Sequence, residues 1–308
     1  MLRRVLRSGY DRDAGVELQG ASSMLSSSEL NRQEFEAMVR RSDAEIDLAA
    51  ASLMVARVEY PDLDIGAYVR KLDKMAEKVR DLIGVERHPS TVAAALVRYL
   101  FRELAFTGAT DEYFDPRASY LNEVLDRGIG IPISLSIVYM EVARRAGFQV
   151  DGVGLPGHFI VKHPQPGGEI YIDPFNQGAV LSREDCVWKV HEIYNGNVEF
   201  QPYMLGAVTK RQILAREIHN LKTIYAAARA RERALAMVEF LLILAPWDLD
   251  ELRDRGMLRY HLGDAPGAIE DLETYLKYSS QAGDADAVRS NVRAIRRVLR
   301  GSSGITWA

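Results

Sequence analysis

Three polar side chains could form a nucleophile–base–acid set. His158 precedes one short apolar run of the sequence, and Asp173 ends the next. A carboxylate can hold an imidazole in one tautomer, and an oriented imidazole can activate a hydroxyl group. Ser134 and Ser136 are the hydroxyl residues of the segment 127–136, which leads into a helix whose backbone N–H groups could receive an oxyanion. Ser134, His158 and Asp173 are therefore the candidate catalytic residues.

Each candidate also has a structural explanation. A histidine beside a glycine on an apolar strand is often a hydrogen-bonded structural residue, and Asp173 begins an Asp-Pro-Phe sequence that is typical of a turn. Ser134 could simply cap a helix. Cys186 follows two acidic residues that disfavour its thiolate, so we expect it to be structural. His158 and Asp173 are too few ligands for a structural zinc site, and we expect no metal and no cofactor.

The segments around His158 and Asp173 predict a small antiparallel sheet. Residues 152–156, 158–162 and 169–173 have the composition of short strands, and residues 163–168 predict a hairpin connection. A symmetric hairpin would place His158 and Asp173 roughly opposite each other, facing the helix that begins near Pro132.

Helices precede these strands. Apolar residues recur mostly at steps of three and four over residues 65–83, which predicts an amphipathic helix. The stretches 92–104 and 135–145 predict two more helices, the second ended by Gly147. With helices first and a small sheet after them, the fold class is α+β. We expect residues 1–28 to form a flexible tail.

The last hundred residues contain an internal repeat. Ala234 and Ala268 lie 34 residues apart, as do Leu242 and Leu276. This period is that of a tetratricopeptide helix–turn–helix, with a turn expected at 262–264. Because two repeats are fewer than usually stand alone, we expect them to pack on the preceding domain. The expected domains, with their tails, are residues 1–28, 29–205, 206–300 and 301–308.

Composition excludes several classes of protein. The 308 residues carry 39 basic and 43 acidic side chains, and this net charge of −4 does not favour nucleic acid as a partner. The longest apolar stretch, residues 234–247, is interrupted by Glu239 and is too short to span a membrane. A single cysteine excludes an intramolecular disulfide and fits a reducing compartment, so we expect a cytoplasmic protein without membrane contacts.

Several motifs together resemble a known family, the SirB-type bacterial proteins, in which a transglutaminase-like core is followed by tetratricopeptide repeats. The resemblance covers roughly residues 45 to 280. It rests on the stretches 49–57, 60–64 and 113–127 and on the sequences Gly-Ile-Pro-Ile-Ser at 130–134, Pro-Gly-His-Phe at 156–159 and Ile-Asp-Pro-Phe at 172–175.

The resemblance implies a papain-like α+β core with a Cys–His–Asp set. His158 and Asp173 match the histidine and aspartate of the family pattern, whereas ungapped alignment places Pro132 at the cysteine position. Proline has no nucleophile, so thiol acyl transfer from that position is impossible. The chain also has Ala109 and Ala118 where asparagine is typical of the family.

Three functions from different classes follow. The first is a non-catalytic module that binds a protein or peptide partner through the repeats. The second is a hydrolase or acyl-transferase that uses Ser134 with His158 and Asp173, which requires the Ser134 hydroxyl to reach hydrogen-bond range of the imidazole. The third is a regulatory scaffold whose two halves stabilise each other.

Overall fold

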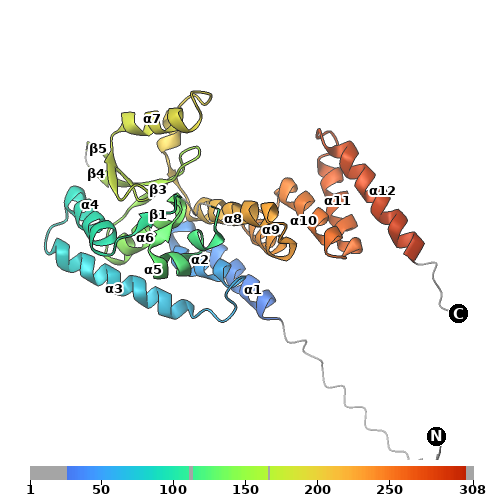
Figure 1. Cartoon of the computed structure of the whole chain (residues 1–308), viewed down its shortest axis with the longest axis horizontal. Coiled ribbons are helices and arrows are strands. Elements are labelled where there is room, and N and C mark those ends of the chain that lie inside the picture. The colour runs from blue at the N-terminus through green and yellow to red at the C-terminus, as the bar shows by residue number, and fades with distance from the viewer. Residues whose placement is uncertain (1–25, 111–113, 166, 303–308) are drawn as a thin grey trace, which may run out of the picture.

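The computed structural model describes residues 26–110, 114–165 and 167–302 (Figure 1). Residues 1–25 of the expected N-terminal tail and residues 303–308 of the expected C-terminal tail lie outside the described part of the chain. Between these limits the helices extend further than we expected. The first helix begins at Ser27 because the Ser26 side chain caps it and Glu29 completes a capping box. The last helix continues to Ser302.

Helices form most of the fold, as the sequence predicts. The helices of the N-terminal part are α1 (Ser27–Val39), α2 (Leu48–Ala56), α3 (Ile65–Ile83), α4 (Pro89–Val97), which continues as a π-helical segment (Arg98–Glu103), α5 (Leu121–Arg127) and α6 (Pro132–Arg145). The later helices are α7 (Arg183–Ile193), α8 (Lys210–Ala227), α9 (Arg231–Leu244), α10 (Leu249–His261), α11 (Ala265–Tyr278) and α12 (Ala285–Ser302).

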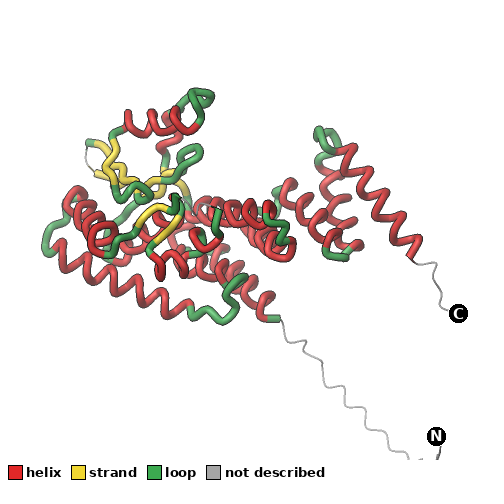
Figure 2. Tube along the Cα trace, in the orientation of Figure 1, coloured by secondary structure: helices red, strands yellow, loops and turns green. Residues whose placement is uncertain are grey.

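The α+β class is confirmed by a five-stranded antiparallel sheet with the order β6-β5-β4-β3-β7. Its strands are β3 (Asp151–Val153), β4 (Ile160–Gln165), β5 (Gly168–Asp173), β6 (Ala179–Leu181) and β7 (Ala207–Val208). Two short strands, β1 (Thr107–Gly108) and β2 (Ile129–Gly130), pair in parallel beside it. Figure 2 shows the strands gathered at the end of the molecule that lies away from the last helices.

The hairpin is tighter than we expected. We predicted a connection over residues 163–168, but β4 and β5 continue pairing up to Gln165 and Gly168. The positive φ of Gly167, 85°, lets the chain reverse within this short distance. At the other end, β4 begins at Ile160 rather than at His158. A turn at Pro156 and Gly157 precedes it, and Gly157 has a φ of 70°.

The sheet is covered on both faces. Successive buried residues of β4 and β5 point to opposite faces of the sheet, so both faces pack against other parts of the protein. Val161 and Ile172 join the main core that contains α6, whereas Ile160 and Tyr171 pack in a second cluster with Cys186 of α7. Helix α6 is buried almost along its whole length and forms the centre of the N-terminal domain.

The repeat helices pack on the core, which confirms our expectation. Residues of α8 and α9, such as Leu214 and Phe240, belong to the same apolar cluster as α2 and α6. Ala234 and Ala268, the small residues of the repeat, are both buried. The expected turn lies between α10 and α11, where Gly263 has a φ of 93°. Helices α11 and α12 pack in a cluster of their own.

Candidate functional site

The structure brings two of the three candidate residues together. The Nε2 atom of His158 lies 2.9 Å from Oδ2 of Asp173, and both side chains are buried. Asp173 ends β5, whereas His158 lies in the turn just before β4. In the register of the sheet, Val161 pairs with Ile172, so the next position along β5, Asp173, lies beside Ile160 rather than beside His158. The side chains therefore meet diagonally, across the end of the hairpin.

The carboxylate of Asp173 is held by several donors. Besides His158, the side chain of Asn176 donates to Oδ2 at 2.7 Å, and the Lys189 ammonium lies 3.1 Å from the same oxygen. Burial alone would raise the pKa of Asp173. The hydrogen bond and charge of His158, with help from Asn176 and Lys189, outweigh burial and lower this pKa to about 2. The carboxylate is therefore ionised at neutral pH and can orient the imidazole.

Phe175 forms one wall beside this pair. Its ring meets the His158 ring edge to face, with centroids 6.0 Å apart. Gly108 on β1 approaches Phe175 so closely that a Cβ atom there would lie 2.7 Å from the ring and from the Phe175 carbonyl oxygen. Glycine at 108 thus lets the β1–β2 pair lie against the Asp-Pro-Phe turn.

Ser134 is placed differently from the pair. It is fully buried in the first turn of α6, where its Oγ donates to the Ala118 carbonyl at 2.7 Å and accepts from the Ile131 N–H at 3.0 Å. In the described part of the chain, no hydrogen bond connects the Ser134 hydroxyl to His158. The hydroxyl is used to hold the start of α6 against the segment before α5.

Pro132, not Ser134, lies beside the imidazole. Pro132, Ile133, His158 and Phe159 line a cavity of about 120 Å³ together with two residues of α8, Arg216 and Asn220. Pro132 is the first residue of α6, and none of the residues that line the cavity carries a hydroxyl or thiol. The arrangement can bind and orient a polar group, and the residues that line it include no side chain that could act as an acyl-transfer nucleophile.

Helix α8 contributes two residues to this site that we did not expect from the sequence. The Arg216 guanidinium donates to the carbonyl groups of Leu155 and His158, at 3.0 and 2.7 Å, and stacks over the Phe159 ring. Arg216 thereby holds the turn that carries His158. Arg216 and Asn220 are four residues apart on one helix, a spacing that places both on one face. That spacing was the only signal for them in the sequence.

Cys186 cannot replace the missing nucleophile. The side chain is buried on α7, on the opposite face of the sheet from α6. Burial, reinforced by the neighbouring Asp185, raises the pKa of the Cys186 thiol to about 11. A thiol with such a pKa is mainly protonated at neutral pH and is a poor nucleophile.

No group of three or more His, Cys, Asp or Glu side chains is arranged to hold a metal ion within residues 26–110, 114–165 and 167–302. Over the same residues, none of the helices combines the length and the apolar character needed to cross a bilayer.

A larger hollow lies where the core meets the repeats. This groove, of about 1030 Å³, is bounded by α1, α9 and the turn that leads into α10. Its apolar residues include Val39, Leu242 and Trp247, and the Trp247 side chain is 78% exposed. Its charged residues are mostly paired within the protein. Arg32 contacts Glu239 at 2.7 Å and thereby joins α1 to α9.

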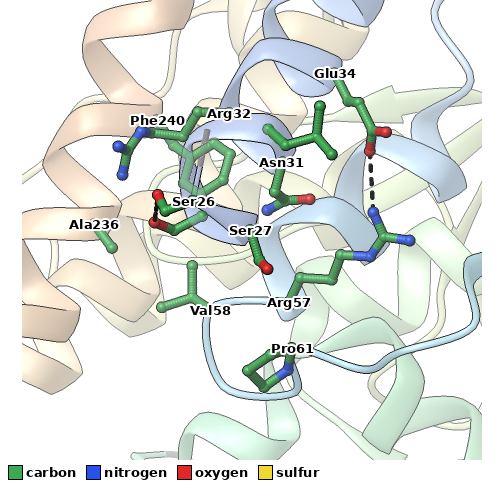
Figure 3. A pocket seen from close by; sticks show the side chains of 12 residues that line it. Ser26, Ser27, Asn31, Arg32, Glu34, Arg57, Val58, Pro61, Ala236 and Phe240 are labelled. Carbon is green, nitrogen blue, oxygen red and sulfur yellow. Dashed lines mark hydrogen bonds and ion pairs between the residues drawn. The ribbon is translucent and has the colours of Figure 1, made fainter. Parts of the chain in front are cut away.

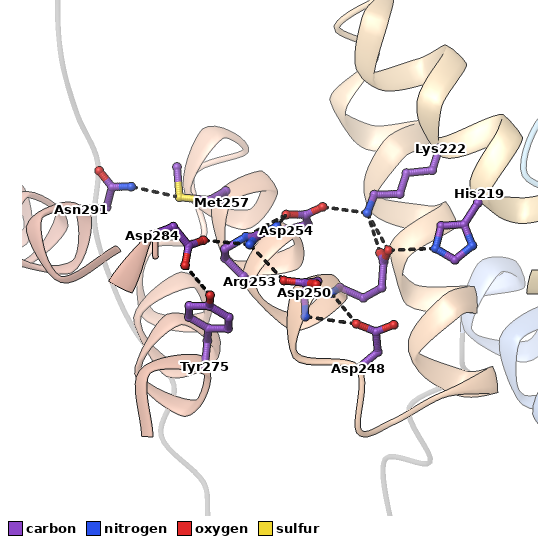
Figure 4. A network of polar contacts seen from close by, with 11 residues as sticks. His219, Lys222, Asp248, Asp250, Arg253, Asp254, Met257, Tyr275, Asp284 and Asn291 are labelled. Carbon is purple, nitrogen blue, oxygen red and sulfur yellow. Dashed lines mark hydrogen bonds and ion pairs between the residues drawn. The ribbon is translucent and has the colours of Figure 1, made fainter. Parts of the chain in front are cut away.

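A polar network fixes the repeat helices relative to one another (Figure 4). The Lys222 ammonium of α8 lies 2.7 Å from carboxylate oxygens of both Glu251 and Asp254 on α10. Arg253 continues the network to Asp284, which precedes α12, at 2.8 Å. Glu251 is nearly fully buried, so its carboxylate needs these partners. The network therefore fixes the angle between α8 and α10 and holds the wall of the groove in place.

These features define a class of protein: a transglutaminase-like core that keeps the His–Asp pair and continues into tetratricopeptide repeats. Two family models match the chain accordingly, the transglutaminase-like superfamily over residues 66–219 and the tetratricopeptide repeat over residues 221–293.

Curated relatives specify the family further. A UPF0162 protein of Xylella fastidiosa (strain 9a5c) is 38% identical over 253 residues, which cover 81% of this chain and 90% of the relative. A UPF0162 protein of Pseudomonas aeruginosa is 30% identical and covers 75% of this chain and 84% of its own length. Human F-box only protein 21 is 27% identical over 58% of this chain and 29% of its own length. No solved structure matches the chain. The chain belongs to the UPF0162 family of transglutaminase-like proteins.

Proposed function

We propose that this chain is a non-catalytic, SirB-type binding module that recognises a segment of a protein partner in the groove between α1, α9 and α10. The observation that carries the proposal is that Pro132 and His158 line one small cavity, and that none of the residues lining it carries a thiol or hydroxyl. The cytoplasmic location expected from the single cysteine is part of the same proposal.

The groove favours an apolar peptide side chain as its main occupant. Its volume of about 1030 Å³ is large for a small-molecule site, and Trp247 is exposed at the junction of the core and the repeats. Arg40 pairs with Glu36 and Arg255 with Asp271, so these charges are already satisfied by the protein itself. Burial of Trp247 would therefore provide most of the binding free energy, as tryptophan does at many interfaces.

The hydrolase alternative has no comparable support. It requires the Ser134 hydroxyl to donate to His158, whereas that hydroxyl donates to the Ala118 carbonyl. A fluorophosphonate probe tests this alternative directly. We expect no labelling of the native chain, and labelling that is lost in Ser134→Ala would contradict the non-catalytic proposal.

Site-specific crosslinking tests the groove. A photoreactive phenylalanine derivative at position 247 identifies the partner in cells, and the same derivative at position 188 serves as control. Trp188 is 67% exposed, on α7, and does not line the groove. With the purified partner, we expect Trp247→Ala to weaken binding at least tenfold and Trp188→Ala to change it less than twofold. Equal effects of the two substitutions would contradict the proposed surface.

A further inference from the structure

A second cavity, of about 510 Å³, lies between α1, the end of α2 and α9 (Figure 3). Much of its wall is apolar, with Val58 and Pro61 from the loop after α2 and Ala236 and Phe240 from α9. Apart from Arg32, which lines both, it uses other residues of α1 than the groove does. Leu30, Asn31 and Glu34 line the cavity, whereas Glu29, Gln33 and Glu36 line the groove. Its size is that of a small-molecule site.

One polar side chain in this cavity lacks a partner. Asn31 is only 7% exposed, and its amide nitrogen donates to the Met54 carbonyl at 2.8 Å. The amide oxygen, Oδ1, is buried and accepts no hydrogen bond from the described residues. Figure 3 shows the Asn31 amide among the side chains of Ser27, Val58 and Arg57, which line the same cavity. Because the nitrogen is engaged by Met54, the amide orientation is fixed and the buried oxygen is left without a donor.

The charges around the cavity are balanced. Arg57 contacts Glu34 at 3.0 Å, and Arg32 contacts Glu239 at 2.7 Å. Neither guanidinium is left without a carboxylate, so the cavity provides little attraction for an anion. A charged ligand would also lose its hydration against Phe240, Val58 and Pro61. The occupant that fits these walls is neutral.

We propose that this cavity binds a compact, neutral aromatic molecule that carries one N–H or O–H donor. The ring packs against the apolar wall formed by Val58, Pro61 and Ala236, and the donor satisfies Oδ1 of Asn31. This site is separate from the groove proposed for the protein partner, since Arg32 is the one residue that lines both. Because the cavity includes residues of α1, of the segment just after α2 and of α9, a ligand here would also contact both the core and the repeats.

A pair of isosteric probes tests the proposal on the full chain. Indole has one N–H donor, and benzofuran has nearly the same shape with an ether oxygen instead. Titration followed by ligand-observed NMR gives both dissociation constants. We expect indole to bind at least fivefold more tightly than benzofuran, because only indole can donate to Asn31. Failure of indole to bind at millimolar concentration, or equal affinity for the two probes, would overturn the proposal.

Variants locate the binding in the cavity. In Asn31→Leu the preference for indole should disappear. Ala236→Phe should abolish binding of both probes, because it fills the cavity from α9 without changing Asn31. Gln33→Leu removes an exposed amide from the groove face of α1 and should leave both affinities unchanged. If Asn31→Leu fails to fold, the affinities of the two probes for the native chain and for Ala236→Phe still test the proposal. Retained binding to Ala236→Phe would refute the assignment.

Discussion

Replacing Asp173 with Asn should destabilise the protein in a pH-dependent manner. The substitution keeps the shape of the side chain but removes its charge. Three donors, from His158, Asn176 and Lys189, converge on one carboxylate oxygen. An amide cannot accept from all three and would direct its own N–H₂ group towards a donor. The interactions that hold the His158 turn against β5 would be weakened together.

The size of the effect follows from the pKa of Asp173. The interactions in the folded protein lower this pKa from 3.8 to about 2. At about 1.4 kcal/mol for each pKa unit, the ionised carboxylate contributes about 2 kcal/mol of stability. Because the folded-state pKa is depressed, this contribution is fully present above about pH 4 and is lost as the pH falls towards about 2. The variant should therefore be about 2 kcal/mol less stable at pH 7.

Urea unfolding of both proteins at pH 7, 5, 4 and 3 measures this difference. Asp62→Asn is the matched control, since Asp62 is exposed. It should change the free energy of unfolding by less than about 0.5 kcal/mol at every pH, as surface substitutions usually do. We expect the loss in Asp173→Asn to be constant from pH 7 to 5 and to shrink at pH 3. A loss that stays the same down to pH 3, or one below about 0.5 kcal/mol at pH 7, would refute the role assigned to the ionised pair.

Three further predictions concern the surroundings of the pair. Ser134→Ala should lower the free energy of unfolding by about 1–3 kcal/mol, as measured in urea, because it removes two buried hydrogen bonds; an unchanged stability would contradict its role in holding α6. Gly108→Ala should destabilise by about 1–3 kcal/mol, because the new methyl group overlaps Phe175, whereas Gly283→Ala, with open space around it, should have little effect on the melting temperature. The Cys186 thiol should not react with a disulfide reagent at pH 8 until denaturant is added, because burial holds it protonated; rapid reaction of the native protein would show that α7 does not cover it.

Local patterns in the sequence were sufficient to predict helix α3 and the helical repeat. The apolar positions along residues 65–83 predicted α3, since a 3.6-residue period identifies one buried helix face whatever that face packs against. The offset between Ala234 and Ala268 predicted the repeat, because two similar helix–turn–helix units need a small residue at the same place of close approach. The limits of β4 and the hairpin were less accurate, because glycine φ angles and strand register depend on pairing across the sheet.

By itself, the sequence determined that this protein has a helical core, a small sheet and two repeats, and that His158 and Asp173 end up on neighbouring segments. These are properties of residue type and local spacing. Only the tertiary structure decided that Ser134 bonds to Ala118, that Arg216 of α8 holds the His158 turn, and that Asn31 faces a cavity with an unpartnered oxygen. Each of these depends on a contact between segments far apart in the chain, and the packing of whole helices sets such contacts.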